Sequence, residues 1–324
     1  MRYVVRFMLS VVLLLGSVQA WAENWPTKPV KFILSQAAGT PPDIIARMVA
    51  ERLSKVWGQP IIIENRGGGQ NIIGTQAAAR SPADGYTFFF ATTAAVVTNI
   101  YTFKSLPYDP VKDFAPVAMI GLSPFLVAAN EKFPASTTAE LIDLGKSNPD
   151  KYSFASDGQR GFGGMLGDML KKQTGMKVLH VPYSGAAQAL QDTIAGRTQY
   201  TFMGIPAVLP YVQRGQLKAI AVSSAHRLPG LENVPTLSET VPGFAYVGWF
   251  VLLAPTGVPA DIIQAANRGV EKTLKDPELV EKLRGFGIYT EGAGTPESVA
   301  AFMRSEREKW AKTVQEIGIK PEDY

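Results

Sequence analysis

The segment VKFILSQAAGTPPDIIARMVAERLSKVWG (residues 30–58) carries the clearest signal of the fold. It begins with an apolar run at 30–34, which is typical of a buried strand. A turn rich in Gly and Pro follows at 35–42. From Asp43, the expected N-cap, apolar residues recur at helical spacing as far as Gly58, and glycine is the usual residue for ending a helix. The segment therefore predicts one strand–loop–helix unit.

The same alternation continues along the chain, which indicates an α/β protein. Further strands are expected at Pro60–Ile63, Tyr86–Ala91, Gln199–Met203 and Lys218–Ser223, and strand–helix units at 152–174 and 178–195. The last third instead predicts long amphipathic helices at Ala260–Leu274, Pro277–Arg284 and Pro296–Ile317. Strands that are separated by helices of about 10 to 15 residues predict parallel sheets that are covered on both faces.

Two apolar segments, Val117–Ala128 and Tyr246–Ala254, are candidates for strands that connect two domains. If these segments lie side by side, one domain is discontinuous in sequence and the other lies between the two connections. We therefore expect a first lobe from residues 23–123 and 248–324, and a second lobe from residues 124–247. A cleft between two α/β domains is the usual place for a ligand.

The composition excludes several classes of protein. The 324 residues include no Cys and two His, which excludes disulfides, thiolate metal sites, a cysteine nucleophile and a multi-histidine metal centre. The formal net charge of +4 is modest, and no basic run indicates a nucleic-acid partner. Residues 1–22 combine early arginines, an apolar run and Ala20-Trp-Ala22, the pattern of a cleaved secretory signal peptide. We therefore expect an exported protein without a metal or cofactor.

The motifs of hydrolases and nucleotide-binding enzymes are incomplete. Gly121-Leu-Ser-Pro-Phe125 lacks the second glycine of a nucleophile elbow, and Gly69–Thr75 has the glycine spacing of a P-loop without its lysine. His180 lies in an apolar strand and His226 in a polar loop. Both are interpreted as structural, because a general base needs a nucleophile beside it. We expect that the chain is not an enzyme, with a secreted hydrolase as the less favoured alternative.

Two glycine-rich loops, Gln36–Asp43 and Ser156–Gly164, each lead from the carboxyl end of an expected strand into a helix. The unpaired N–H groups at a helix N-terminus favour an anion by ~0.3–1 kcal/mol. The alternative is that these residues only form tight turns. Because Asp43 would place a negative charge beside the first loop, an anion there is expected to be held through water.

The chain also contains a series of segments that, in order, are Trp25-Pro-Thr-Lys-Pro-Val-Lys-Phe-Ile, Asp43-Ile-Ile-Ala-Arg47, Gly58-Gln-Pro, Glu64-Asn-Arg66, Pro82-Ala-Asp-Gly-Tyr86, Leu106–Pro116, Val181-Pro-Tyr-Ser-Gly185 and Pro255-Thr-Gly-Val-Pro259. Their order and spacing resemble the Bug proteins, the periplasmic solute receptors of tripartite tricarboxylate transporters. The resemblance extends essentially from end to end.

The resemblance implies a type II periplasmic-binding-protein fold, with two doubly wound α/β lobes that are joined by two hinge strands and close over a carboxylate. It implies a periplasmic receptor that delivers its ligand to a membrane permease. A receptor that reports the ligand to a membrane signalling partner is the alternative, and we expect a monomer. The candidate ligand-binding residues are Gln36, Ala37, Ala38, Gly39, Thr40, Thr92, Thr93, Ser156, Asp157, Gly158, Arg160, Gly161, Phe162, Tyr183 and Met203.

The chain departs from the family pattern where the ligand is expected. The family commonly has histidine where Gly164 stands, and often aspartate where Met203 stands. Because methionine cannot pair with an α-amine, amino acids are expected to be disfavoured ligands. Arg160 is a candidate partner for a second ligand carboxylate or for Asp157 at the surface. Phe162 and Met203 are candidates for an apolar wall or for core packing. Together they favour a dicarboxylate or an aromatic carboxylate.

Overall fold

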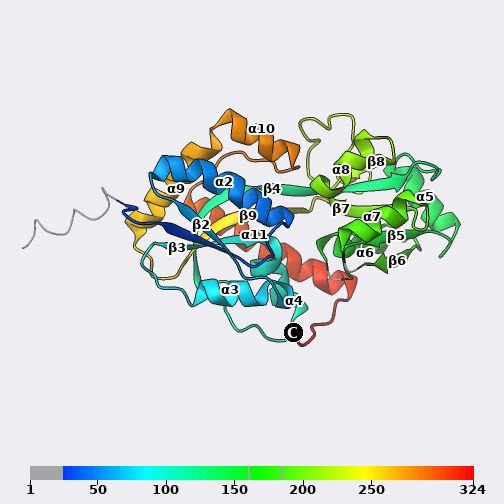
Figure 1. Ribbon diagram of the computed structural model, residues 1–324. Coiled ribbons are helices and arrows are strands. Elements are labelled where there is room, and N and C mark those ends of the chain that lie inside the picture. The colour runs from blue at the N-terminus through cyan, green and yellow to red at the C-terminus, as the bar shows by residue number, and fades with distance from the viewer. Residues whose placement is uncertain (1–24, 160, 184) are drawn as a thin grey trace, which may run out of the picture.

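Two α/β lobes, with strands that pass between them, make up the computed structural model (Figure 1). The structure describes residues 25–159, 161–183 and 185–324. The expected signal peptide and Arg160 lie outside these ranges. The strands are β1 (Val30–Leu34), β2 (Ile61–Asn65), β3 (Thr87–Thr92), β4 (Phe114–Asn130), β5 (Ser153–Ser156), β6 (Leu179–Pro182), β7 (Tyr200–Gly204), β8 (Leu217–Val222) and β9 (Val247–Pro255).

Helices cover the sheets on both sides. They are α2 (Pro41–Trp57), α3 (Ile72–Ala79), α4 (Asn99–Thr102), α5 (Thr138–Ser147), α6 (Phe162–Thr174), α7 (Ala186–Ile194), α8 (Ile205–Gln213), α9 (Ala260–Leu274), α10 (Pro277–Gly285) and α11 (Pro296–Ile317), with the short segments η1 (Gly69–Asn71), η2 (Ala94–Thr98) and η3 (Leu237–Glu239). The two-lobed α/β architecture confirms the predicted fold class.

The strand order is β2-β1-β3-β9-β4-β7-β5-β6, with β8 paired to β4. β1 pairs in parallel with β2 and β3, and β5 pairs in parallel with β6 and β7, as the alternation of strands and helices predicts. The pairs that involve β4 or β9 are antiparallel, so the prediction of parallel sheets is wrong there. The reason is that the chain leaves the first lobe along β4 and returns to it along β9.

The two connecting segments lie side by side, as the sequence predicts. β4 pairs with β9 from Phe114 to Pro124 and with β7 from Phe125 onward, so this one strand belongs to both lobes. The expected lobe boundaries, 123/124 and 247/248, fall at this change of partner and at the start of β9. The exact boundaries stay a prediction.

Local sequence explains most helix ends. α9 and α11 have the predicted bounds, and α2 ends before Gly58, whose φ of 68° is the left-handed conformation that glycine adopts at no steric cost. α8 was not expected, because Pro206 and Pro210 interrupt its helical pattern; Pro206 stands in the first turn, where its missing N–H is not needed.

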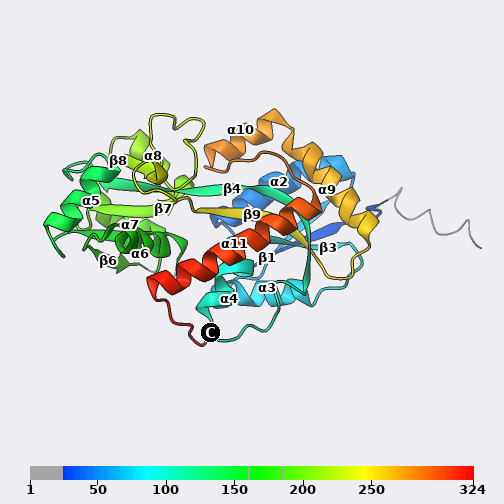
Figure 2. The ribbon, with the colours of Figure 1, turned by 180° about the vertical axis from the view of Figure 1, so that it is seen from behind.

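Helix α11 connects the two lobes on the face of the molecule that Figure 2 shows. Figure 2 shows it running from the first lobe toward α6 of the second. Trp310 of α11 packs against Phe162 at the start of α6, with ring centroids 5.1 Å apart. Trp249 of β9 donates from Nε1 to the buried carboxylate of Glu306, at 3.1 Å. The helix therefore fixes both a hinge strand and the start of α6.

Candidate functional site

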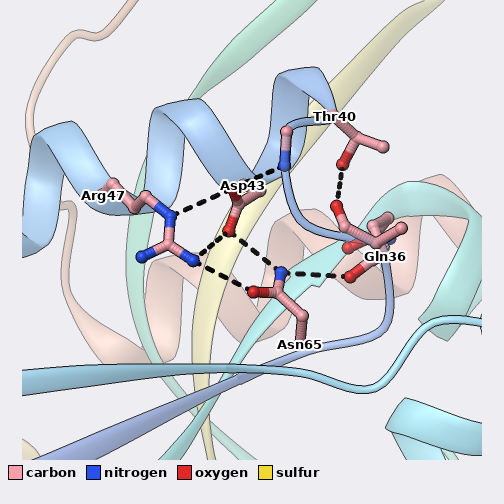
Figure 3. Close-up of polar contacts among 7 residues, drawn as sticks. Gln36, Thr40, Asp43, Arg47 and Asn65 are labelled. Carbon is pink, nitrogen blue, oxygen red and sulfur yellow. Dashed lines mark hydrogen bonds and ion pairs between the residues drawn. The ribbon is translucent and has the colours of Figure 1, made fainter.

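The loop from β1 to α2 is held by one buried carboxylate (Figure 3). Asp43 Oδ2 accepts hydrogen bonds from the Gly39 N–H at 2.9 Å and from Arg47 Nε at 3.0 Å. Asp43 Oδ1 accepts from Asn65 Nδ2 at 2.9 Å, and the same nitrogen donates to the Gln36 carbonyl at 3.1 Å. Arg47 closes the network by donating to Asn65 Oδ1 at 3.1 Å. The loop backbone is therefore fixed from Gln36 to Gly39.

Asp43 has a different role from the one predicted. α2 begins at Pro41 with Thr40 as its N-cap, so Asp43 lies in the first turn and is not the N-cap. Its carboxylate accepts the Gly39 N–H, one of the groups expected to face a ligand. Burial raises the pKa of Asp43, but the hydrogen bonds from Arg47, Gly39 and Asn65 outweigh it and hold this pKa below its ordinary value.

The second loop, from β5 to α6, is shaped by glycines. Gly158 has a φ of 141°, which side chains rarely adopt, and its carbonyl accepts from the Gly161 N–H at 3.2 Å. Gly164 lets the loop lie close to α6, because a Cβ there would press on the Gly158 carbonyl and lie 2.9 Å from His180 Cε1. α6 begins after Gly161 without a side-chain cap from the described residues and without an acidic residue in its first turn.

A cavity of about 650 Å³ lies between the lobes. It is lined by Gln70, Asn71, Ala94, Thr98, Asn99, Thr102, Asp157, Gly158, Gln159, Gly161, Phe162, Met165 and Glu322. Of the sequence-predicted residues, this cavity thus brings together Asp157, Gly158, Gly161 and Phe162. Desolvation by the surrounding protein raises the pKa of the Asp157 carboxyl.

The first loop does not line this cavity, but it is hydrogen-bonded to a residue that does. Gln36 Nε2 donates to Asn71 Oδ1 at 2.8 Å and to Thr92 Oγ1 at 3.2 Å, and Asn71 lines the cavity. Ala37, Ala38 and Gly39 are exposed and do not line it.

Three other residues that were predicted to bind the ligand instead make contacts within the protein. Thr93 is buried and its Oγ1 accepts the Trp249 N–H of β9 at 2.9 Å. Tyr183 donates to Asp192 Oδ2 at 2.8 Å, and burial together with this bond raises the pKa of Tyr183 to about 12. Met203 is 1% exposed in the core of the second lobe, which is the core-packing alternative.

The sequence analysis did not predict the residues that form the lobe 1 wall of the cavity. Gln70 and Asn71 follow the Gly67–Gly69 run, and Asn71 has a left-handed φ of 79°. Asn99 Nδ2 donates to the Gln70 carbonyl at 2.8 Å and thereby joins η1 to α4. The available signal was a third glycine-rich loop between a strand and a helix, which follows β2 and therefore lies at the same edge of the lobe 1 sheet as the loop after its parallel neighbour β1.

The structure also contains a serine–histidine pair that the sequence argument took to be absent. Ser156 Oγ lies 2.7 Å from His180 Nε2, and His180 Nδ1 lies 3.1 Å from Asp168 Oδ2. The spacing of these three residues along the chain matches no hydrolase motif, so the pairing is visible only in the fold. Ser156 is 0% exposed, so its hydroxyl is not accessible to a substrate as a nucleophile.

A second cavity, of about 290 Å³, lies beside the hinge and includes His226. Its two arginines already have acidic partners, since Arg227 pairs with Glu239 at 2.7 Å and Arg284 with Glu281 at 2.6 Å. The first cavity is the better candidate for an anionic ligand on a different ground, because the N-terminus of α6 opens onto it at Gly161 and Phe162, although the charged described residues that line it, Asp157 and Glu322, are acidic.

A two-lobed α/β fold with a cavity lined by both lobes defines the class of type II periplasmic binding proteins. Within the ranges that the structure covers, none of the helices is both long and apolar enough to cross a membrane. A family model described as "Tripartite tricarboxylate transporter family receptor" matches residues 45–319. The chain belongs to this family, which confirms the resemblance to the Bug proteins.

Individual relatives match over most of the chain. Protein BugT of Bordetella pertussis is 31% identical over 301 residues, which are 92% of this chain and 92% of BugT. The structure of R. palustris Rpa4515 with adipate is 33% identical, with a TM-score of 0.82 over 92% of this chain and 99% of that one. MatC from Rhodopseudomonas palustris with bound malate is 28% identical, with a TM-score of 0.76 over 90% and 100% of the two chains.

Proposed function

We propose that this chain is a periplasmic receptor that binds a small carboxylate, of the dicarboxylate or aromatic class, and delivers it to the permease of a tripartite tricarboxylate transporter. The observation that carries the proposal is the cavity whose walls come from η1, η2 and α4 of one lobe and from residues 157–159, 161 and 162 of the other. A ligand that contacts both walls favours closure of the lobes about β4 and β9. Relatives with adipate and malate indicate the ligand class.

The start of α6 supports an anion in this cavity. Gly161 and Phe162 line the cavity at the N-terminus of α6, where the first turn carries no acidic residue. The positive end of a helix dipole favours a carboxylate there. The cavity volume of about 650 Å³ lies within the ~300–1,000 Å³ that small-molecule sites occupy. Phe162 supplies an apolar face for the body of the ligand.

Asp157 bears on the prediction that amino acids are disfavoured. That prediction relied on position 203, but Met203 lies in the core and Asp157 supplies a carboxylate at the cavity wall. An ammonium group would find a partner there, so glutamate and aspartate are needed beside the dicarboxylates in any ligand panel. A panel in which only these amino acids bind would contradict the prediction that amino acids are disfavoured ligands.

The test is a thermal-shift panel of adipate, malate, benzoate, glutamate and aspartate, followed by calorimetry. A ligand at about 100 times its Kd stabilises the native state by ~2.7 kcal/mol, which is a readily measured shift. Stabilisation by a dicarboxylate or by benzoate, with no chemical change in the ligand, supports the proposal. Turnover of the ligand, or no response to any carboxylate, contradicts it.

A charge variant tests the place of binding. Asn71→Asp retains the acceptor for Gln36 Nε2 and Ser35 Oγ but adds a negative charge to the cavity wall. The charge should weaken dicarboxylate binding about fivefold or more, since repulsion between two unit charges about 4 Å apart is ~1–4 kcal/mol. Asn233→Asp, in an exposed loop outside the cavity lining, adds the same charge and should leave affinity unchanged. Equal affinities for the two variants would place the ligand elsewhere.

A further inference from the structure

A chain of buried hydrogen bonds runs behind the second loop. His180 Nε2 lies 2.7 Å from Ser156 Oγ, and the Ser156 hydroxyl lies 2.9 Å from the Gly158 carbonyl. On its other side His180 Nδ1 faces Asp168 Oδ2 at 3.1 Å. The His180 side chain is 5% exposed and Ser156 is 0% exposed, so water does not substitute for these bonds. The chain of bonds ends on the cavity-lining residue Gly158.

The number of protons decides which of these bonds exist together. A serine hydroxyl has one hydrogen, so Ser156 donates either to the Gly158 carbonyl or to His180 Nε2. With a neutral imidazole whose Nδ1–H faces Asp168, Nε2 needs the Ser156 hydrogen and the Gly158 carbonyl loses it. Only the imidazolium, with hydrogens on both nitrogens, donates to Asp168 and to Ser156 while Ser156 still donates to Gly158.

The surroundings of the imidazole favour this coupling. Phe154 of β5 stacks on the His180 ring with centroids 4.3 Å apart and fixes its plane. Among the residues that the structure describes, the charged groups beside the imidazole are on α6, where Lys171 Nζ pairs with Asp168 at 3.4 Å. Tyr200 of β7 lies on Phe154 at 5.6 Å, and burial raises the pKa of its phenol, so Tyr200 stays neutral. Asp168 is therefore the carboxylate that faces the Nδ1 side of the imidazole.

We propose that His180 and Asp168 are positioning residues of the ligand loop, and that protonation of His180 fixes the Gly158 carbonyl and strengthens carboxylate binding. The part of this inference that concerns carboxylate affinity rests on the proposed function, whereas the part that concerns the position of the Gly158 carbonyl does not. Two effects act in the same direction: the protonated form orders the loop, and it places a positive charge behind an anion site. Affinity for a carboxylate should therefore rise as pH falls from 8 to 6.

The first experiment uses no ligand. The chain has two histidines, so His226→Gln leaves a single imidazole to follow by NMR. Between pH 8 and 6, the amide signals of Gly158 and Gly161 should shift with the same midpoint as the His180 ring. In Ser156→Ala the ring should still titrate while the two amides no longer follow it. Amides that ignore the His180 titration in the parent, or that still follow it without the Ser156 hydroxyl, overturn the proposal.

The second experiment measures adipate binding by calorimetry at pH 6, 7 and 8. Coupling between two sites in proteins typically changes affinity about fivefold or more, and we expect a gain of that size from pH 8 to 6. His180→Gln, whose amide N–H is a permanent donor toward Ser156, should bind with little pH dependence. Adipate itself titrates identically with both proteins, so equal pH dependence in the two would refute the coupling.

These two experiments separate the proposals from each other. If no carboxylate binds at any pH while the Gly158 and Gly161 amides follow His180, the receptor function fails and the positioning role stands. If adipate binds and the amides do not follow His180, the receptor function stands and the positioning role fails. Asp168→Asn provides a further variant, in which the loop response between pH 8 and 6 should diminish because the carboxylate that faces Nδ1 is gone.

Discussion

Replacing Asp43 with asparagine keeps the size and shape of the side chain and yet should strongly destabilise the protein. Both carboxylate oxygens accept hydrogen bonds: Oδ2 from the Gly39 N–H and Arg47 Nε, and Oδ1 from Asn65 Nδ2. Oδ1 also forms an ion pair with Arg47 Nη2 at 3.0 Å. An amide has one NH₂ group in place of an oxygen. Whichever way it is turned, the NH₂ group of Asp43→Asn faces donors.

The burial of Asp43 and the exposure of Arg47 limit the expected loss in the free energy of unfolding. Asp43 is 3% exposed, and breaking a buried ion pair by removing one partner costs ~3–5 kcal/mol. The Arg47 side chain is 52% exposed and stays hydrated, so we expect the lower end, about 3 kcal/mol. The control is Asp84→Asn: Asp84 is about half exposed, 3.6 Å from Lys28, and such surface pairs contribute ~0–1 kcal/mol.

Urea unfolding at several pH values measures the effect. Because the pKa of Asp43 is lower in the folded than in the unfolded chain, its contribution is complete above the unfolded value of about 3.9 and is lost as pH falls through the folded value. The difference between wild type and Asp43→Asn should be constant from pH 8 to about 5 and shrink in more acidic solution. A difference at pH 7 no larger than that of Asp84→Asn would refute the argument.

Two further substitutions test the second loop and the hinge. Gly164→Ala puts a Cβ against the Gly158 carbonyl and should cost ~1–3 kcal/mol and weaken carboxylate binding. Gly285→Ala, at the end of α10 and with no atom within 4 Å of the new Cβ, should do neither, and calorimetry and urea unfolding would show whether the two variants differ. Thr93→Val leaves the buried N–H of Trp249 without its acceptor and should lower the free energy of unfolding by ~1–3 kcal/mol, and an unchanged urea midpoint would contradict this role.

The fold was largely predictable, because it follows from hydrophobic periodicity and from residues that begin or end helices. The segment 30–58 gives β1, its loop and α2, and the helices 260–274 and 296–317 have the predicted bounds. The direction of strand pairing was not predictable at the hinge. An apolar segment such as Val117–Ala128 shows that a strand is buried, but not that one half of it pairs with β9 and the other with β7.

The candidate site was predictable in outline and not in detail. The loop 156–162 was identified because glycines between a strand and a helix leave backbone N–H groups open to a ligand. Asp43 was assigned correctly to the start of α2 and incorrectly as its cap, since the choice between capping the helix and bonding Gly39 depends on Arg47 and Asn65. Arg47 lies about one helical turn after Asp43, but Asn65 is 22 residues away in the sequence, so spacing alone does not show the complete network.

The two loops are held by different kinds of force, and this difference divides their roles. The loop after β1 is fixed by an ion pair whose carboxyl has a lowered pKa, so its shape should not change between pH 5 and 8. The loop after β5 is held by the contact of Gly158 with Gly164 and by bonds to one neutral hydroxyl and one imidazole. Such bonds are weaker and change with protonation. The loop after β1 should therefore keep its shape over this pH range, and adjustment to the ligand and to pH should fall to the loop after β5.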